Sequence, residues 1–248
     1  MNKADLPAGS YTTRIREVAS FWLDVVFPPV CALCGRVGWL LCPQCEANLA
    51  VVSPTICYRC GRMSEGAQPL PTGRLCRECR ANPLPLRQMR APLRYQEPTS
   101  DLIHRFKYEG YSALGRPLAH FLIAGWPDWE QNPDLIVPVP LHPKRRRWRG
   151  YNQSELLARP LGSAKSIAVC ASALRRTRDT IPQVGLGPDE RQSNVRGAFE
   201  ADATVVDGRH VLLVDDVLTT GATMSAAAEA LMAAGAVSVS AYCLARVS

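Results

Sequence analysis

Apolar residues in this chain gather into short runs that lack polar alternation. The clearest run is VLLV at 211–214, and DLIVPVP at 134–140 and the segment 238–245 follow the same pattern. Such runs are typical of strands buried on both faces of a parallel sheet. Helical periodicity appears between them, and this alternation predicts an open parallel α/β sheet. We expect further strands at 91–95 and 166–171, and helices at 100–107, 112–125 and 151–161.

Polar residues with distinct chemistry follow the 211–214 run. Asp215 and Asp216 come first, at what we expect to be a solvent-facing strand end. Small and hydroxyl-bearing residues then open an alanine-rich helix, whose N-terminal N–H groups favour an anion. The acidic pair cannot face a phosphate, so it should face sugar hydroxyls or a metal. A P-loop is excluded because G-x-x-x-x-G-K-[ST] does not occur. The residues of the predicted anion loop are Thr219, Thr220, Gly221, Ala222 and Thr223.

Length and charge set the broad class. The 248 residues suffice for one α/β domain and a small additional module, and the net charge of +7 suggests an anionic partner. No apolar run approaches the length of a membrane span, and the N-terminus lacks the apolar core of a secretory signal. We therefore expect a cytoplasmic protein with reduced thiols. Helical spacing at 11–27 predicts an amphipathic helix.

Eight of the ten cysteines form four CxxC pairs within an internal repeat. PPVCALCG at 28–35 matches SPTICYRCG at 53–61, and LCPQC at 41–45 matches LCREC at 75–79. Two CxxC knuckles complete a tetrahedral zinc site, with disulfides or thioredoxin-type redox pairs as the alternatives. Disulfides fit a reducing compartment poorly, and a redox pair would not occur four times in a repeat. The expected zinc ligands are Cys31, Cys34, Cys42, Cys45, Cys57, Cys60, Cys76 and Cys79.

The repeat favours two sequential ligand sets, and interleaved sets remain open. We expect two structural zinc ions, which should supply the folding energy of a segment with little core of its own. Cys170 and Cys243 stand alone in apolar surroundings and should be core residues. The expected domains are an N-terminal helix at 1–27, a double zinc ribbon at 28–82 and an α/β domain at 83–248.

Two basic segments follow predicted strands. LHPKRRRWRG at 141–150 is expected to be a loop after the 134–140 strand, and LRRTRDTIPQ lies at 174–183. Loops at the carboxyl ends of parallel strands meet at one edge, so 141–150 and the anion loop should face one crevice. A solvated loop is the alternative for either basic segment. Trp148 and Tyr151 are interleaved with the first, which suits single-stranded nucleic acid, although Trp148 would equally fit a packing anchor.

The string VLLVDDVLTTGATMS at 211–225 resembles the phosphoribosyl pyrophosphate (PRPP) signature of type I phosphoribosyltransferases. The resemblance implies that Asp215 and Asp216 hold the ribose 2′- and 3′-hydroxyls and that Thr219–Thr223 wraps the 5′-phosphate. It also implies a type I phosphoribosyltransferase-like fold for the α/β domain. Another doubly wound protein with an acidic strand end and a phosphate loop is the alternative.

Besides the double CxxC module, four stretches carry a second resemblance: RFKYEG (105–110), VPVPLHPKRRRWRGYNQSELLA (137–158), RRTRDTIPQ (175–183) and NVRGAF (194–199). They resemble the ComF/GntX proteins, also called the ComFC family of competence-related phosphoribosyltransferase-like proteins. The resemblance implies zinc ribbons before the phosphoribosyltransferase fold and a cytoplasmic role in natural transformation, where imported single-stranded DNA is handled. It also suggests a helicase of the competence machinery as a partner.

An enzyme of this kind would catalyse displacement at C1 of PRPP, with Mg²⁺ bridging the pyrophosphate and the ribose hydroxyls. Basic side chains would neutralise the leaving pyrophosphate, and the segment around 175–178 would close over the site. No nucleobase-reading hood is identifiable, so the acceptor and turnover itself stay open. The expected pyrophosphate residues are Lys144, Arg145, Arg149, Arg176 and Arg178.

A binding module would keep this fold and take nucleic acid as its ligand. Residues 28–90 contain eight Arg against three Glu and no Lys or Asp, and Arg suits phosphate forks and base stacking. A pure DNA-binding module has no reason to keep the PRPP signature, and a pure salvage enzyme has no reason for Arg-rich ribbons. We therefore favour a phosphoribosyl-binding protein that engages single-stranded DNA over a nucleotide-salvage phosphoribosyltransferase without a DNA role. The nucleic-acid candidates are Arg146, Arg147, Trp148, Tyr151, Arg59 and Arg77.

Overall fold

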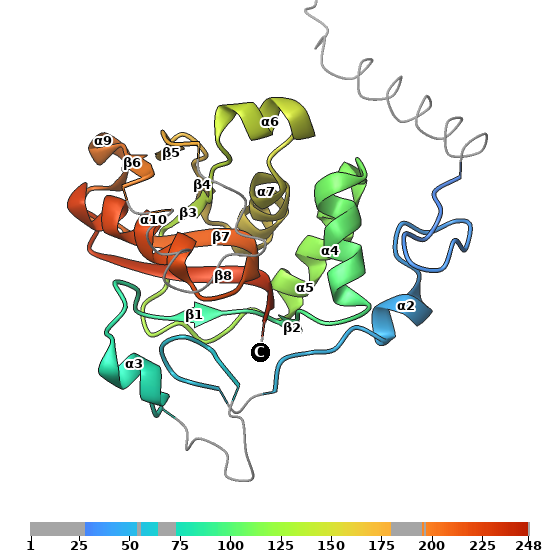
Figure 1. Ribbon diagram of the computed structural model, residues 1–248, viewed down its shortest axis with the longest axis horizontal. Coiled ribbons are helices and arrows are strands. Elements are labelled where there is room, and N and C mark those ends of the chain that lie inside the picture. The colour runs from blue at the N-terminus through green and yellow to red at the C-terminus, as the bar shows by residue number, and fades with distance from the viewer. Residues whose placement is uncertain (1–27, 54–55, 64–72, 180–194, 196, 248) are drawn as a thin grey trace, which may run out of the picture. The chain divides into compact units, whose positions relative to one another are not determined.

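The computed structural model divides the chain into two compact units, Met1–Ala47 and Asn48–Ser248. The larger unit contains the sheet and the long helices (Figure 1). The helix expected at 11–27 lies outside the residues that the structure describes. The described residues are 28–53, 56–63, 73–179, 195 and 197–247.

A six-stranded parallel sheet forms the centre of the larger unit. Its strands follow the order β1-β8-β7-β3-β4, and β2 also pairs with β8. The apolar runs identified in the sequence form the central strands, which confirms the predicted parallel α/β sheet. The strands are β1 (Met89–Arg90), β2 (Leu93–Arg94), β3 (Leu135–Pro138), β4 (Ala168–Val169), β7 (His210–Leu218) and β8 (Ser238–Arg246), while β5 (Leu174–Arg176) and β6 (Phe199–Ala201) form a separate antiparallel pair.

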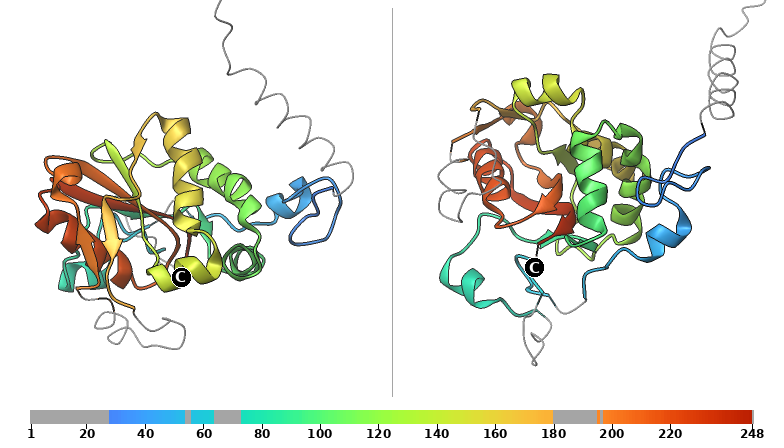
Figure 2. Two further views of the ribbon diagram at one scale, coloured as in Figure 1. Left: turned by 90° about the horizontal axis from the view of Figure 1, so that it is seen from above. Right: turned by 45° about the vertical axis from the view of Figure 1, so that its right-hand side comes forward.

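Helices cover both faces of the sheet (Figure 2). On one face α5 and α7 pack together, and Tyr242 of β8 donates its hydroxyl to the carbonyl oxygen of Gly125 at 2.6 Å. α10 packs on the opposite face, so strands without polar alternation are buried on both sides. Among the described residues, no helix is long and apolar enough to cross a bilayer. The helices are α2 (Pro43–Ala47) in the smaller unit and α3 (Arg77–Ala81), α4 (Thr99–Tyr108), α5 (Gly115–Ala124), α6 (Pro143–Arg149), α7 (Gln153–Lys165), α9 (Ala203–Val206) and α10 (Ala222–Ala233), with a 3₁₀ turn at Ser112–Leu114, in the larger.

The basic segment after β3 forms helix α6, so the prediction of a loop is wrong. Pro143 occupies the first turn, where the N–H that it lacks has no partner within the helix. The His142 side chain accepts a hydrogen bond from the Lys144 N–H at 3.4 Å. Gly150 ends the helix with φ of 83°, a left-handed conformation that favours glycine. The caps at both ends therefore stabilise this helix despite the repulsion among its basic side chains.

The second cysteine group belongs to the larger unit. Cys57 and Cys60 are buried in the same core as β7, β8 and α10. Arg246 of β8 donates to the Cys60 carbonyl oxygen at 2.7 Å, and the Met89 N–H donates to that of Arg59, also at 2.7 Å. The first cysteine group lies within the smaller unit. The two repeats thus share a sequence pattern but occupy different surroundings.

Candidate functional site

β3 and β7 are neighbouring strands, and each leads into a segment that carries candidate site residues. These strands are parallel neighbours, with Pro138 paired to Val214, and the Val139 N–H donates to the Val214 carbonyl oxygen at 2.9 Å. β3 leads into α6 and α7, and β7 leads through residues 219–221 into α10. This edge is the place where doubly wound α/β proteins bind ligands.

The two signature carboxylates lie within β7, not at the solvent-facing strand end that we expected. The strand continues beyond them because residues up to Leu218 still pair with β8. Asp216 is consequently only 3% exposed, and its Oδ1 lies 2.6 Å from Lys107 Nζ of α4. Asp215 is half-buried, and its Oδ1 accepts a hydrogen bond from Ser154 Oγ of α7 at 2.6 Å. Each carboxylate therefore has its own partner.

Burial and mutual repulsion change how these groups titrate. Burial and then the charge of Asp216 raise the pKa of Asp215 to about 6, against the opposing effects of Ser154 and Lys107. Burial alone would lower the pKa of Lys107, but the two carboxylates outweigh it and raise that pKa. Among the described residues, Asp216 Oδ2 is buried without a hydrogen-bond partner. A ligand hydroxyl or a divalent cation would satisfy this oxygen, so the residues fit the expected ribose and Mg²⁺.

The anion loop runs from Thr219 to Thr223 and becomes α10. Gly221 has φ of 84°, which a residue with a Cβ adopts only with strain, and it is the N-cap of the helix. Thr220 Oγ1 accepts a hydrogen bond from the Ala222 N–H at 3.4 Å. The N-terminus of a twelve-residue helix thus opens beside the carboxylates, as an anion site requires.

Lys107 and Ser154 are site residues that sequence reasoning missed. Asn152 caps α7 by accepting from the Ser154 N–H at 3.2 Å, and its Nδ2 donates to the Val139 carbonyl oxygen at 3.1 Å. This cap fixes Ser154 against Asp215. The Asn-x-Ser pattern before a helical run could have indicated the cap, whereas no local signal in the sequence points to the Lys107 pair.

The predicted pyrophosphate residues come from α6 and from the segment around β5. Lys144 Nζ lies 3.2 Å from Asp179, which links α6 to the residues after β5. Arg176 is buried; burial and then the charge of Arg145 lower its pKa, while Asp215 and Asp179 oppose the change. These groups therefore share one electrostatic environment with the β7 carboxylates. Arg178 is exposed, and the residues 180–194 that follow lie outside the described part.

The aromatic candidates on and after α6 differ in their surroundings. Trp148 is 69% exposed, and its ring centroid lies 6.2 Å from that of Tyr108. Arg149 lies over the same Tyr108 ring at 5.1 Å. Tyr151 is half-buried and donates its hydroxyl to the Phe106 carbonyl oxygen, which anchors α7 to the last turn of α4.

The arginine candidates are distributed over two places. Arg146 Nη2 lies 3.4 Å from Glu155, and Arg147 is exposed on the same helix. Arg59 and Arg77 both lie in the second zinc ribbon, far from α6 in the sequence. Only the α6 arginines are next to the exposed Trp148 in the sequence.

The eight paired cysteines form two Cys₄ groups in sequential order, so interleaved pairing does not occur. In each group, ligand atoms from all four residues lie within 4.8 Å of one another. The Cys34 and Cys42 sulfurs are 3.6 Å apart, and those of Cys60 and Cys76 are 3.8 Å apart. Tetrahedral zinc with Zn–S bonds of about 2.3 Å places sulfurs about 3.8 Å apart. The groups are Cys31, Cys34, Cys42 and Cys45, and Cys57, Cys60, Cys76 and Cys79.

Electrostatics in the first group also fit a cation. Burial opposes ionisation of Cys31, but backbone hydrogen bonds, including one from the Cys42 N–H at 3.4 Å, lower its pKa to about 6. Burial and then the neighbouring sulfurs raise the pKa of Cys45 to about 12. Four such thiols become thiolates together only when a cation neutralises them, and Zn²⁺ has the matching ligand preference.

Comparison with known proteins identifies both modules. The double zinc ribbon domain family matches residues 22–80, and the phosphoribosyl transferase domain family matches residues 156–248. These matches confirm the predicted fold class, a type I phosphoribosyltransferase-like sheet after a double zinc ribbon. Adenine phosphoribosyltransferase from Leishmania donovani, a solved structure, is similar over 55% of this chain and 53% of its own, with 16% identity and a TM-score of 0.34.

Several relatives span most of the chain. "DNA utilization protein YhgH" of Escherichia coli strain K12 is 35% identical over 222 residues, 88% of each protein. "Competence protein F" of Haemophilus influenzae is 35% identical over 61% of this chain and 69% of its own. "Competence protein ComFC" of Bacillus subtilis is 28% identical over 83% of this chain and 84% of its own.

Proposed function

The chain belongs to the ComF/GntX family of competence-related phosphoribosyltransferase-like proteins. We propose that it binds PRPP or a related phosphoribosyl ligand at the carboxyl end of β7, and that it also binds single-stranded DNA. The first part is supported by one arrangement above all: two carboxylates within β7, followed by the Thr-Gly loop that begins α10. The names of the relatives support the second part. We place both activities in the cytoplasm, during the handling of imported DNA.

In this proposal each of the two carboxylates binds one hydroxyl of the ribose. Asp215 is the more accessible and would accept a hydrogen bond from one hydroxyl, while Ser154 holds its other oxygen. Asp216 Oδ2 would accept from the second hydroxyl, because Lys107 already occupies Oδ1. The 5′-phosphate would receive N–H groups and hydroxyls from the loop at Thr219–Thr223.

Transfer from PRPP would be a displacement at C1. An electron pair of the acceptor forms the new bond to C1 while the C1–O bond to pyrophosphate breaks, and pyrophosphate leaves with that electron pair. Lys144 and Arg145 of α6 and the buried Arg176 would stabilise the charge that grows on the leaving group. Bound Mg²⁺ would add further neutralisation of the pyrophosphate.

The DNA part of the proposal relies on α6. Trp148 presents an exposed ring that a base could stack on, and Arg147 is exposed beside it for phosphate contacts. The intact PRPP signature alone would also fit a salvage phosphoribosyltransferase without a DNA role. Binding of single-stranded DNA distinguishes the two functions.

Calorimetric titration with PRPP, with and without Mg²⁺, tests the first part. Asp215→Asn should weaken binding about tenfold or more, because a hydrogen bond to a charged group contributes about 1.5–3 kcal/mol. Asp128→Asn, the same change at an exposed residue outside the site, should have no effect. Absence of binding to the wild-type protein at millimolar PRPP would refute the phosphoribosyl function. Titration with an oligonucleotide tests the DNA part separately.

A further inference from the structure

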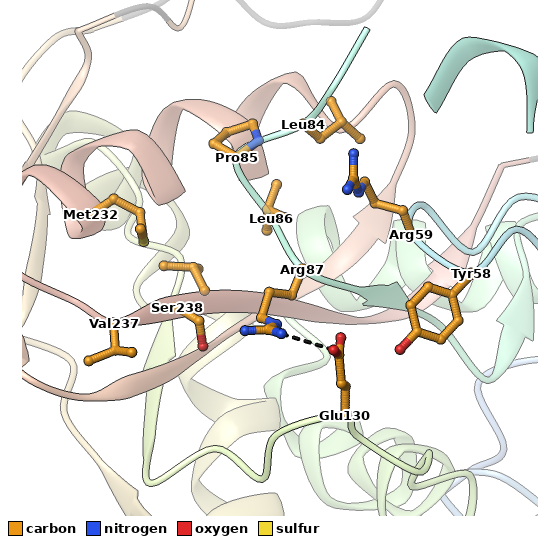
Figure 3. Close-up of a pocket in the computed structure, with 11 residues that line it drawn as sticks. Tyr58, Arg59, Leu84, Pro85, Leu86, Arg87, Glu130, Met232, Val237 and Ser238 are labelled. Atoms are coloured by element: carbon orange, nitrogen blue, oxygen red, sulfur yellow. Dashed lines mark hydrogen bonds and ion pairs between the residues drawn. The ribbon is translucent and has the colours of Figure 1, made fainter. Parts of the chain in front are cut away.

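A pocket of about 450 Å³ lies on the larger unit (Figure 3). It is lined by the zinc knuckle between Cys57 and Cys60, the segment before β1, the end of α10 and the start of β8. Ser238, in its lining, is paired with His210, whereas Asp215 is paired with Cys243, five residues further along β8. At about 3.3 Å per residue this separation is roughly 16 Å. The pocket is therefore distinct from the phosphoribosyl site.

The zinc knuckle presents Tyr58 and Arg59 to this pocket from a fixed backbone. Both residues lie between two cysteines of one Cys₄ group and line the pocket. In Figure 3 the Arg59 guanidinium lies toward Leu84 and the Tyr58 ring toward Glu130. The hydrogen bond from the Met89 N–H to the Arg59 carbonyl oxygen holds the knuckle on the strand β1. Arg90 lies over the Tyr58 ring at 5.8 Å. The Cys₄ group and the sheet therefore both hold this wall of the pocket in place.

The charges around the pocket leave one guanidinium available. Arg87 is engaged, because its Nη2 lies 2.9 Å from Glu130 and its Nη1 donates to Gln131 at 3.0 Å. Among the described residues, the Arg59 guanidinium has no partner. Two arginines against one glutamate give the lining an excess of one positive charge. This arrangement suits a single phosphate group.

The opposite wall is apolar and accessible. Met232 is 43% exposed and Val237 is 53% exposed, and Leu84 and Leu86 complete the lining across from them. Methionine adapts its shape to flat or irregular ligands. The volume falls in the range of about 300–1,000 Å³ that is typical of small-molecule sites. An aromatic side chain, an open arginine and an apolar wall match the parts of a nucleotide.

We propose that this pocket binds one nucleotide, with its phosphate on Arg59 and its base against Met232 and Val237. Its natural source would be one residue of a DNA single strand, so this assignment rests on the DNA part of the proposed function. A free mononucleotide has the same chemistry and is the other possible source. Because the site is separate from the β7 carboxylates, a nucleotide and a phosphoribosyl ligand would bind at the same time.

Titrations of the full zinc-loaded protein with dTMP, and with an oligothymidylate of about twelve nucleotides, test the assignment. Arg59→Ala should weaken dTMP binding about tenfold, as expected for loss of a charge-assisted contact. Met232→Glu, which places a carboxylate on the apolar wall, should have a similar effect. Arg80→Ala removes the same charge from an exposed position of the same ribbon outside the pocket and should change binding less than twofold.

The outcomes separate this proposal from the functions on which it is built. PRPP binding should be unchanged in all three variants, and its absence from the wild type would refute only the phosphoribosyl function. If dTMP binds through Arg59 and the oligothymidylate does not, the pocket takes a free nucleotide and the DNA part fails. If neither probe binds, or if Arg59→Ala and Met232→Glu bind as the wild type does, the pocket assignment is wrong.

Discussion

Lys107→Met would remove the ammonium group that neutralises Asp216 and would keep a side chain of similar length. The Lys107 Nζ and Asp216 Oδ1 atoms are 2.6 Å apart, and their side chains are 20% and 4% exposed. Without the ammonium group, Asp216 would be a buried carboxylate beside a second carboxylate, Asp215. We therefore expect the larger unit to lose stability at neutral pH.

The low exposure of both partners sets the size of this effect. Removing one partner of a buried ion pair costs about 3–5 kcal/mol, because the remaining charge is stranded. We expect the lower end, about 3 kcal/mol, since Lys107 retains some contact with water. For a unit of this size, each kcal/mol corresponds to a shift of roughly 2–4 °C in melting temperature, so a loss of roughly 6–12 °C is expected.

A double-mutant cycle in urea measures the interaction directly. Lys107→Met, Asp216→Asn and the double variant would be unfolded at pH 7.5, with near-ultraviolet circular dichroism as the signal. The double variant should recover much of the loss, because an asparagine leaves no stranded charge. This recovery would appear as a coupling free energy of about 2 kcal/mol or more.

Lys165→Met provides the matched control. Lys165 lies over the Trp126 ring at 5.2 Å, and this contact should contribute no more than about 1 kcal/mol. If Lys107→Met costs no more than Lys165→Met, the ion pair does not stabilise the site. Additive effects of Lys107→Met and Asp216→Asn would likewise contradict the reasoning.

Three further predictions concern zinc, pH and DNA. Cys60→Ser should lower the melting temperature of the larger unit in calorimetry, because this cysteine lies in the core of the sheet. Cys42→Ser, in the smaller unit, should leave the melting temperature of the larger unit unchanged. PRPP affinity should fall as pH drops through about 6, where Asp215 takes up a proton, and Asp215→Asn should lack this inflection. Arg147→Ala should reduce the slope of log affinity for single-stranded DNA against log salt concentration by about 0.7. Trp148→Ala should weaken that binding by about 1–3 kcal/mol at any salt concentration. Unchanged binding in both variants would mean that the two residues have only a structural role.

The sequence predicted the central strand, the start of a helix after the Thr-Gly segment, and both Cys₄ groups because each depends on local pattern. The 211–214 run and the Thr-Gly loop form a continuous motif, and the cysteine repeat indicated the sequential zinc ligands. The ends of β7 were less predictable. Leu218 remains in the strand because β8 pairs with it, and this partner also buries Asp216.

Contacts between distant segments explain the features of the site and of the core that the sequence did not predict. Lys107 reaches Asp216 across 109 residues of sequence, and Ser154 reaches Asp215 only because Asn152 caps α7 above β7. The packing of Cys60 in the core of the sheet likewise depends on tertiary structure. Helix α6 is different, because the residues that begin and end it, Pro143 and Gly150, are visible in the sequence.

Amide hydrogen exchange with and without PRPP and Mg²⁺ tests the central claim most directly. A phosphate that accepts N–H groups at the start of α10 should slow exchange in peptides covering Thr219–Thr223, and a bound ribose should slow it around Asp215 and Asp216. Peptides from the second zinc ribbon should exchange as before. Slower exchange in the second zinc ribbon, without slower exchange in the Thr219–Thr223 loop, would contradict a phosphoribosyl site at the carboxyl end of β7.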